Sequence, residues 1–356
     1  MNTTEDVFVS GSDGYGCFRI PVLLRLATGA IAAFAEGRFI DCRDQGQRID
    51  VVSKMSLDNG SSWSALRVVH SESNASAPSV AIGGPTPVLL PDGRVLIVVT
   101  RNVRRLLALT STGTDALSWS KAIDLTPQVT NCSSCSLSSG PARGVLLDGG
   151  RLAMPAYGSA VGGAAALLSD DLGRTWRRSA NAVVGGGESA LALAPNGSVL
   201  MLSRSGGGSS AVLQSTSRPG GESWGAGAPM AAFRGMATCR GSLLRMGSLL
   251  LYSHPGNVSD RGNRWNLTVW TSRDSGGSWA EVAQVEPPSL NASDLAALHT
   301  AYSSLVQLNE THAAVLYERG PMGARAGAGE YQRLRWHAFP VPSPPISEDA
   351  RGNHPI

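Results

Sequence analysis

The octapeptide SLDNGSSW, residues 56–63, belongs to a repeat that decides the fold of this chain. The same pattern, S-x-D-x-G-x-x-W, returns in SDDLGRTW at 169–176 and SRDSGGSW at 272–279, with degraded copies in TGTDALSW at 112–119 and SRPGGESW at 217–224. Successive tryptophans of these five copies are 48 to 57 residues apart. A period near this length, with a tryptophan-bearing turn in each unit, is typical of β-propeller blades.

The chemistry of the octapeptide predicts a structural turn and not a catalytic site. An aspartate can accept a hydrogen bond from the backbone two residues further on, and a glycine adopts positive φ without strain. We expect the tryptophan of each copy to pack back between neighbouring repeat units.

Strand–turn–strand segments accompany the octapeptides along the chain. Each has aliphatic and β-branched residues on both sides of a turn that carries Gly or Asn. The segments cover residues 21–36, 86–99, 143–157, 189–204, 241–254 and 302–318. Together they predict one all-β domain, a six-bladed β-propeller with four-stranded blades, over residues 1–344.

The two ends of the chain offer the strands that the last blade lacks. No sixth octapeptide is present, but the head EDVFVSGS (5–12) and the tail YQRLRWHAFPVP (331–342) both have strand character. They could complete the last blade by joining the chain ends. Residues 345–356 are expected to be a disordered tail.

Charge and hydropathy argue against several classes of protein. The net charge is +3 over 356 residues, and there is no basic block, so nucleic acid is not an expected partner. No run of 18 apolar residues exists, so no membrane span is expected. The six histidines are scattered and no metal-ligand cluster is visible, so we expect neither a metal nor a cofactor.

Cysteine and asparagine usage bears on the compartment. Cys132 and Cys135 lie in a Ser-rich loop without a second pair, which favours a local disulfide or two idle thiols over zinc or thioredoxin chemistry. Five cysteines leave at least one unpaired within the chain. N-x-Ser/Thr sequons, which also make good turns, begin at Asn2, Asn59, Asn74, Asn131, Asn196, Asn257, Asn266, Asn291 and Asn309. This excess predicts a glycosylated, secreted or lumenal protein, although MNTTEDVFVS (1–10) lacks the form of a signal peptide.

Three arginines occupy comparable places in the repeat. Arg19, in CFRIPVLLR (17–25), heads the first inner strand; Arg204 ends a strand pair; and Arg264 opens a strand before the third intact octapeptide. Strand ends near a propeller axis crowd together, and converging guanidinium groups repel one another unless they share an anion. The pattern predicts a site for a carboxylate or phosphate, in which Glu318 could brace Arg19 when no ligand is bound.

FRIP near the start, followed by three S-x-D-x-G-x-x-W octapeptides at blade spacing, resembles the sialidase (neuraminidase) family over nearly the whole chain. These octapeptides are the family's Asp boxes. The resemblance implies a six-bladed propeller that hydrolyses terminal sialic acids from glycoproteins, glycolipids or oligosaccharides without a cofactor. Sialylated glycoconjugates are then the expected partners.

The resemblance also implies a role for each arginine and for one loop aspartate. Arg19, Arg204 and Arg264 would clamp the carboxylate of the sugar, with Arg261 as an alternative to Arg264. The segment FAEGRFIDCRDQG (34–46) resembles the family stretch that holds a pocket arginine and the acid/base aspartate. These would be Arg38 and Asp44, with Asp41 as a nearby competitor.

Four further residues follow from the same resemblance. Tyr302 in AYSSL (301–305) would be the nucleophile, and Glu188 in GGGESALAL (185–193) the glutamate that activates it. Glu318 would hold the first arginine, and Tyr157 would contact the glycerol side chain. The chain departs from the family in its two degraded boxes and in Gly84, where many members have Asn before Pro.

Two functions other than hydrolysis stay open at this point. A trans-sialidase would share every residue named, because acceptor choice lies in rim loops. A non-catalytic sialoglycan-binding propeller would keep the arginines, and the presence of Asp44, Glu188 and Tyr302 disfavours it. Taken singly, Tyr302 could also be a core tyrosine, and Glu188 and Asp44 ordinary loop residues.

Overall fold

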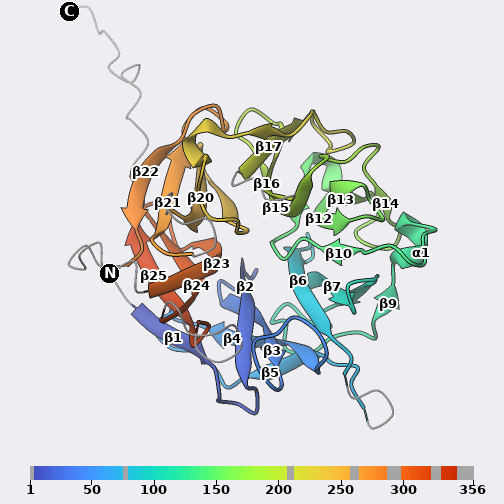
Figure 1. Cartoon of the computed structure of the whole chain (residues 1–356), viewed down its shortest axis with the longest axis vertical. Helices are drawn as coiled ribbons and strands as arrows, with labels where there is room; N and C mark the ends of the chain where they lie inside the picture. Colours follow the sequence, from blue (N-terminus) through green and yellow to red (C-terminus); the bar gives the residue numbers. More distant parts are fainter. Residues whose placement is uncertain are drawn as a thin grey trace, which may run out of the picture.

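The computed structural model describes residues 4–74, 79–206, 212–256, 264–286, 298–321 and 330–342. Six antiparallel sheets are arranged radially around a central axis (Figure 1). The predicted six-bladed β-propeller is therefore confirmed. The tail expected to be disordered, residues 345–356, lies outside the described residues.

Each blade is built from strands that follow one another along the chain. Blade 1 has β2 (Cys17–Arg25), β3 (Ile31–Arg38), β4 (Ile49–Ser56) and β5 (Arg67–His70). Blade 2 has β6 (Ile82–Leu89), β7 (Val95–Arg101), β8 (Arg105–Thr110) and β9 (Ile123–Asp124). Blade 3 has β10 (Ser138–Ser139), β11 (Val145–Leu146), β12 (Leu152–Gly158), β13 (Gly163–Ser169) and β14 (Arg177–Arg178), and both β10 and β11 pair with β12.

The second half of the ring repeats this plan. Blade 4 has β15 (Gly186–Leu193), β16 (Val199–Ser205), β17 (Val212–Ser217) and β18 (Ala228–Pro229). Blade 5 has β19 (Ser242–Met246), β20 (Leu249–Pro255), β21 (Leu267–Ser272) and β22 (Ala280–Gln284). Blade 6 has β23 (Leu298–Gln307), β24 (His312–Pro321), β25 (Arg333–Pro340) and β1 (Thr4–Val9).

Blade 6 joins the two ends of the described chain. The N-terminal strand β1 pairs antiparallel with β25, and it forms the edge of the sheet whose other edge is β23. Figure 1 shows the blue strand β1 beside the red strands of this blade. The pairing closes the ring through backbone hydrogen bonds between segments from opposite ends of the sequence.

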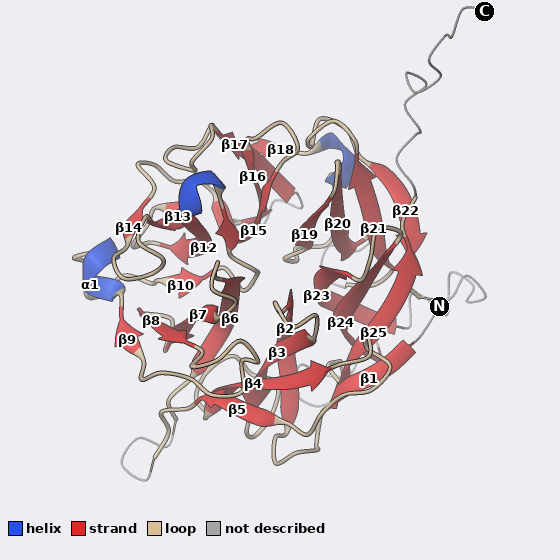
Figure 2. Cartoon of the chain, turned by 180° about the vertical axis from the view of Figure 1, so that it is seen from behind, coloured by secondary structure: helices blue, strands red, loops and turns tan. Residues whose placement is uncertain are grey.

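In the part of the chain that the structure describes, helical structure is limited to short segments (Figure 2). These are α1 (Thr126–Val129) and two 3₁₀ turns at Asp148–Gly150 and Ala231–Phe233. Within the described ranges, no helix has the length and apolar character needed to cross a membrane.

The octapeptide tryptophans pack between neighbouring blades, as predicted. Trp63 of blade 1 lies edge-on to Trp336 of blade 6, with 5.4 Å between ring centroids. Trp119 of blade 2 meets Phe34 of blade 1 in the same way, at 6.2 Å. Trp176 of blade 3 joins an apolar cluster with Leu96 of blade 2. These three tryptophans therefore contribute to the contact with the preceding blade, which explains why the residue recurs in the octapeptide.

The hydrogen bonds of the octapeptide differ from the prediction in one respect. Asp58 accepts hydrogen bonds from the backbone and hydroxyl of Ser62, four residues on and not two, at 2.9 and 2.6 Å. The Ser56 hydroxyl donates to Asp58 and accepts from the Gly60 amide at 2.7 Å. The Gly60 amide inside the turn therefore bonds to Ser56, and the Asp58 carboxylate bonds to Ser62 at the end of the turn. The bonds from Ser62 lower the pKa of Asp58 to about 2.

We predict that Gly60→Ala destabilises the fold more than Gly29→Ala does. Both glycines have positive φ, +89° and +87°, so a side chain at either is strained. A Cβ at Gly60 would also overlap the Trp336 indole, whereas nothing lies within 4 Å of a Cβ at Gly29. Overpacking typically costs about 1–3 kcal/mol, and urea unfolding should show a difference of that size. Equal losses in the two variants would contradict the packing role of the turn.

Candidate active site

Four inner strands have a β-bulge where they approach the axis. The register with the second strand shifts between Arg19 and Val22 in β2, Gly83 and Thr86 in β6, Gly186 and Ser189 in β15, and Thr300 and Ser303 in β23. A bulge leaves a residue out of the ladder and redirects its side chain. Two of the bulges contain Glu188 and Tyr302, so this local irregularity aims both side chains towards the axis.

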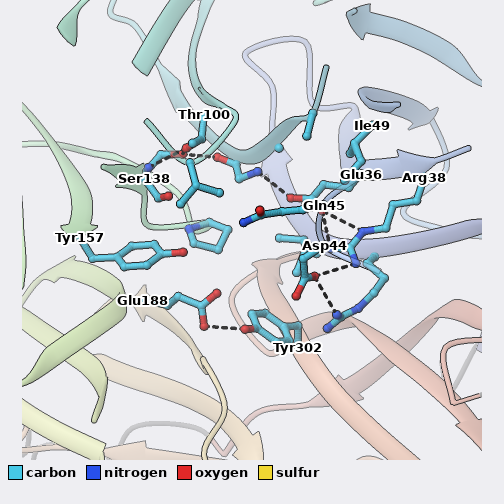
Figure 3. Close-up of a pocket in the computed structure, with 18 of the residues that line it drawn as sticks. Glu36, Arg38, Asp44, Gln45, Ile49, Thr100, Ser138, Tyr157, Glu188 and Tyr302 are labelled. Atoms are coloured by element: carbon cyan, nitrogen blue, oxygen red, sulfur yellow. Dashed lines mark hydrogen bonds and ion pairs between the residues drawn. The ribbon is translucent and has the colours of Figure 1, made fainter. Parts of the chain in front are cut away.

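A cavity of about 440 Å³ opens at this end of the propeller. Residues from all six blades line it (Figure 3). The predicted site residues among them are Arg19, Arg38, Asp44, Tyr157, Glu188, Arg204, Arg264 and Tyr302. The structure thus brings together side chains that are up to 283 residues apart in sequence, from Arg19 to Tyr302. Arg261, the alternative to Arg264, lies outside the described residues.

Glu318 lies behind the cavity and braces Arg19, as the sequence suggested. Its carboxylate accepts hydrogen bonds from Nε and Nη2 of Arg19 at 2.9 and 3.1 Å, and it is fully buried. It also accepts from the backbone amides of Ile20 at 3.0 Å and Tyr302 at 3.2 Å. Both amides belong to bulged segments, so one carboxylate satisfies the donors that two bulges leave unpaired. Burial alone would raise the pKa of Glu318, but the Arg19 charge outweighs it and lowers the pKa.

The phenol of Tyr302 donates a short hydrogen bond to Glu188. The distance from Oη to Oε2 of Glu188 is 2.5 Å, and Nη1 of Arg204 lies 3.1 Å from the phenol and 3.0 Å from the same carboxylate oxygen. Figure 3 shows the Glu188 carboxylate and the Tyr302 hydroxyl joined by this hydrogen bond. Burial and the Glu188 charge raise the pKa of Tyr302 well above its ordinary value. The phenol is therefore neutral, and its proton lies in a hydrogen bond to the Glu188 carboxylate.

The three predicted clamp arginines converge on the Tyr302 ring. The guanidinium carbons of Arg19 and Arg264 each lie 5.3 Å from the ring centroid, and Arg204 bonds to the phenol oxygen. Arg264 also donates to the carbonyl of Thr238 at 3.2 Å. Guanidinium groups donate the paired hydrogen bonds that a carboxylate accepts, so three of them facing one point are suited to holding a carboxylate.

Asp44 projects into the mouth of the cavity from the loop between β3 and β4. Its carboxylate is 2.8 Å from Nη1 of Arg38 and 3.5 Å from Nη1 of Arg19, yet its side chain is 75% exposed. Enclosure acts to raise the pKa of Asp44, but Arg38 and Arg19 outweigh it, and the pKa is lowered. The competitor Asp41 instead pairs with Arg43 at 2.7 Å and does not line the cavity.

Glu36, Tyr331 and Arg240 contact predicted site residues, although no motif in the sequence marked them. Glu36 holds Arg38 at 2.6 Å and accepts the bulged Gly84 amide at 2.8 Å. Tyr331 stacks on the Arg19 guanidinium, 3.8 Å from ring centroid to Cζ. Arg240 is buried, with Cζ 5.3 Å from the Tyr302 centroid. Strand alternation could have revealed Glu36, since it lies two residues before Arg38; no comparable signal marks the other two.

The cysteines form two disulfides and leave one thiol. Cys132 and Cys135 are bonded to each other, so the local disulfide is the alternative that the structure favours. The bond between Cys17 and Cys42 was not predicted. Cys239 is free and buried. No group of three or more possible metal ligands occurs among the described residues.

Comparison with known proteins shows which family and which proteins this chain resembles. Residues 29–315 match the model of the BNR repeat-like domain. The chain is similar to an exo-alpha-sialidase of Aspergillus fumigatus, with 29% identity over 92% of this chain and 84% of that protein. Among solved structures it resembles the Hadza microbial sialidase Hz136, with a TM-score of 0.78 and 21% identity over 95% and 68% of the two chains. It also resembles a leech intramolecular trans-sialidase, with a TM-score of 0.76 and 17% identity over 95% and 70%.

Proposed function

The chain belongs to the sialidase family through its BNR repeat-like domain, and from this premise we propose that it is a retaining exo-α-sialidase. Members of the family are glycoside hydrolases. The observation that supports the proposal most is the contact of the Tyr302 phenol with Glu188, inside a cavity that carries three arginines and Asp44. Terminal sialic acid of glycoproteins, glycolipids or oligosaccharides is the proposed substrate.

The arginines explain how this sugar would be held. Sialic acid carries a carboxylate on its anomeric carbon, and a guanidinium matches a carboxylate with two hydrogen bonds. Arg19, Arg204 and Arg264 surround the ring of Tyr302. A carboxylate bound between them would place the anomeric carbon above the phenol oxygen. Tyr157 lines the same cavity and is proposed to contact the glycerol side chain.

A phenol suits this anomeric carbon better than a carboxylate nucleophile does. An attacking carboxylate would come within about 4 Å of the substrate's own carboxylate, and that repulsion amounts to about 4 kcal/mol at an effective dielectric constant of about 20. Tyr302 is neutral until it reacts, because its pKa is raised. A neutral phenol is a weak nucleophile, and Glu188 at 2.5 Å is placed to remove its proton.

The proposed reaction has two balanced steps. In the first, the Tyr302 oxygen bonds to the anomeric carbon, its proton passes to Glu188, and the leaving oxygen takes the bond electrons and a proton from Asp44. In the second, water attacks the same carbon while Asp44 removes its proton. The bond to Tyr302 breaks and Glu188 returns the proton to the phenol oxygen. Two displacements at one carbon retain its configuration.

Release of 4-methylumbelliferone from its α-sialoside tests the proposed function. We expect turnover by the purified protein, with free sialic acid as the product in its NMR spectrum. Sialic acid binding without turnover would contradict the proposal and favour a sialoglycan-binding propeller. Transfer of the sugar to added lactose in preference to water would instead assign the protein as a trans-sialidase.

A secreted or lumenal location is proposed on independent grounds. The two disulfides need an oxidising compartment. Of the sequon asparagines in the described residues, Asn266 is half-buried, and the exposed ones are Asn59, Asn74, Asn131, Asn196 and Asn309. Exposure is what glycosylation requires.

For sialyllactose, whose leaving group needs a proton, the pH dependence of kcat/KM and that of kcat should differ. Asp44 must be protonated to act as the acid, and Arg38 and Arg19 lower its pKa in the free protein, so kcat/KM should fall as pH rises through the acidic range. A bound substrate carboxylate adds negative charge beside these arginines and raises the pKa of Asp44. The decline in kcat should therefore lie at higher pH than the decline in kcat/KM. Coincident declines, or the same declines in Asp44→Asn, would contradict the role of Asp44.

A further inference from the structure

The Cys17–Cys42 disulfide connects the strand that carries the first clamp arginine to the loop that carries Asp44. Cys17 lies in β2, two residues before Arg19 and opposite Arg38 in the register of β2 and β3. Cys42 lies in the loop at residues 39–48, two residues before Asp44. Its carbonyl also accepts a hydrogen bond from Arg38. The bond thus ties the proposed acid to the wall of the cavity that it serves.

Noncovalent contacts hold the two halves of this loop unequally. The buried side chain of Gln47 accepts from the amide of Ile40 at 2.7 Å and donates to the carbonyl of Arg43 at 2.8 Å, so it fixes the base of the loop. Residues 43–46, which include Asp44, are exposed. Apart from the disulfide, Asp44 is held mainly by its ion pairs with Arg38 and Arg19.

Those ion pairs weaken when the substrate arrives. Exposed ion pairs contribute little to holding a side chain in place, and the Asp44 side chain is 75% exposed. A substrate carboxylate on Arg19 would compete for the guanidinium that now lies 3.5 Å from Asp44. Protonation of Asp44, which acid catalysis requires, removes the remaining charge attraction. The loop is then held by the disulfide and by the hydrogen bonds of Gln47, and of these the disulfide is the covalent link to the strand that carries Arg19.

We propose that the Cys17–Cys42 disulfide positions Asp44 for proton transfer to the leaving group, so that breaking it selectively slows reactions with poor leaving groups. This inference rests on the proposed function. The cysteines are positioning residues, because they act on the substrate only through Asp44. Loss of the link gives a ten-residue loop more conformational freedom, and a misplacement of about 1 Å can cost about 100-fold in rate.

Two substrates distinguish loss of Asp44 positioning from general damage to the fold, because their leaving groups differ in their need for a proton. Cleavage of sialyllactose releases lactose as an alkoxide that needs a proton, whereas the methylumbelliferyl sialoside releases a stable phenolate that scarcely needs one. The constant to compare is kcat/KM, because it reports the steps up to loss of the leaving group. In Cys17→Ser/Cys42→Ser we expect kcat/KM to fall about 10- to 100-fold for sialyllactose, and by no more than about threefold for the methylumbelliferyl sialoside.

The second disulfide provides a matched control. Cys132 and Cys135 are three residues apart, and neither lines the cavity. Cys132→Ser/Cys135→Ser removes the same number of bonds and should leave both rate constants within about twofold of the wild type. Equal losses on the two substrates in Cys17→Ser/Cys42→Ser, or none on either, would overturn the inference.

Reduction of the folded protein covers the case in which the double variant does not fold. In the Cys132→Ser/Cys135→Ser background, Cys17–Cys42 is the remaining disulfide. Mild reduction, verified by mass spectrometry of the alkylated peptides, should produce the same substrate-dependent loss, and reoxidation of an unalkylated sample should reverse it. An unchanged ratio of the two rate constants after complete reduction would overturn the inference. Absence of wild-type turnover on both substrates would instead count against the proposed function.

Discussion

Replacing Tyr302 with phenylalanine is expected to lower kcat/KM for a sialoside by about 10³-fold or more, in line with the loss of other enzyme nucleophiles. The variant lacks only the phenol oxygen, which lies 2.5 Å from Glu188 and 3.1 Å from Arg204. Without that oxygen no covalent intermediate can form, and Glu188 has no proton to remove. Initial rates with the methylumbelliferyl sialoside measure the effect.

The binding of sialic acid should survive in Tyr302→Phe. The aromatic ring remains between Arg19 and Arg264, and the clamp itself is unchanged. Isothermal titration with sialic acid should give a dissociation constant within about tenfold of the wild-type value. Wild-type turnover in this variant would refute the nucleophile assignment, and loss of binding together with turnover would show that the substitution had damaged the clamp.

Glu318→Gln is the second substitution with a large expected effect. Each oxygen of the Glu318 carboxylate accepts one hydrogen bond from Arg19 and one from a backbone amide, of Ile20 or of Tyr302. Glutamine has nearly the same shape, but its amide nitrogen faces donors, and the buried Arg19 keeps only the more distant ion pair with the exposed Asp44. Breaking a buried pair in this way typically costs about 3–5 kcal/mol of unfolding free energy. Activity should fall as well, because both the clamp and the nucleophile depend on this carboxylate.

Glu222→Gln is a suitable control for that comparison. Glu222 pairs with Arg151 and Arg177 at 2.7 and 2.6 Å, but its side chain is 51% exposed. A surface pair of this kind is worth about 0–1 kcal/mol. Denaturant unfolding of the two variants should therefore show a clear loss for Glu318→Gln alone. Similar losses would mean that the buried pair contributes no more than a surface pair does.

The destabilisation by Glu318→Gln should depend on pH in a defined direction. Burial opposes ionisation of Glu318, but Arg19 lowers its pKa in the folded protein. The stabilisation is then fully present above the pKa of glutamate in the unfolded chain, and it is lost as pH falls through the folded value. The difference between wild type and variant should shrink on acidification. A constant difference would argue that shape, and not charge, explains the effect.

Much of the fold could be predicted because its signals are local. In the octapeptide at 56–63, the bonds among Ser56, Asp58 and Gly60 involve residues no more than four positions apart. The tryptophan spacing then gave the length of a blade. The partner of the aspartate was predicted wrongly, because turn propensity does not show which side of the turn the Ser56 hydroxyl occupies.

The residues of the site were predicted mainly through a family resemblance, and not from local pattern. The resemblance did not identify residues that only support the others. Arg240 lies against Tyr302 and Tyr331 lies against Arg19, and no motif marks either of them. The Cys17–Cys42 disulfide was not predicted for a related reason. Five cysteines allow many pairings, and it is the fold that brings Cys17 of β2 next to Cys42 in the loop that follows β3.

The sequence by itself determined the number of blades, the turn of each unit and the kinds of side chain available for a carboxylate site. Only the tertiary structure decided how those side chains are held. Glu318 meets the amide of Ile20, 298 residues away, because the ring closes through β1 and β25. Local hydrogen bonds form between residues that are close in sequence, so they appear as a recurring sequence pattern. A carboxylate that accepts hydrogen bonds from bulged amides in two blades gives no such pattern, because closure of the whole ring determines its partners.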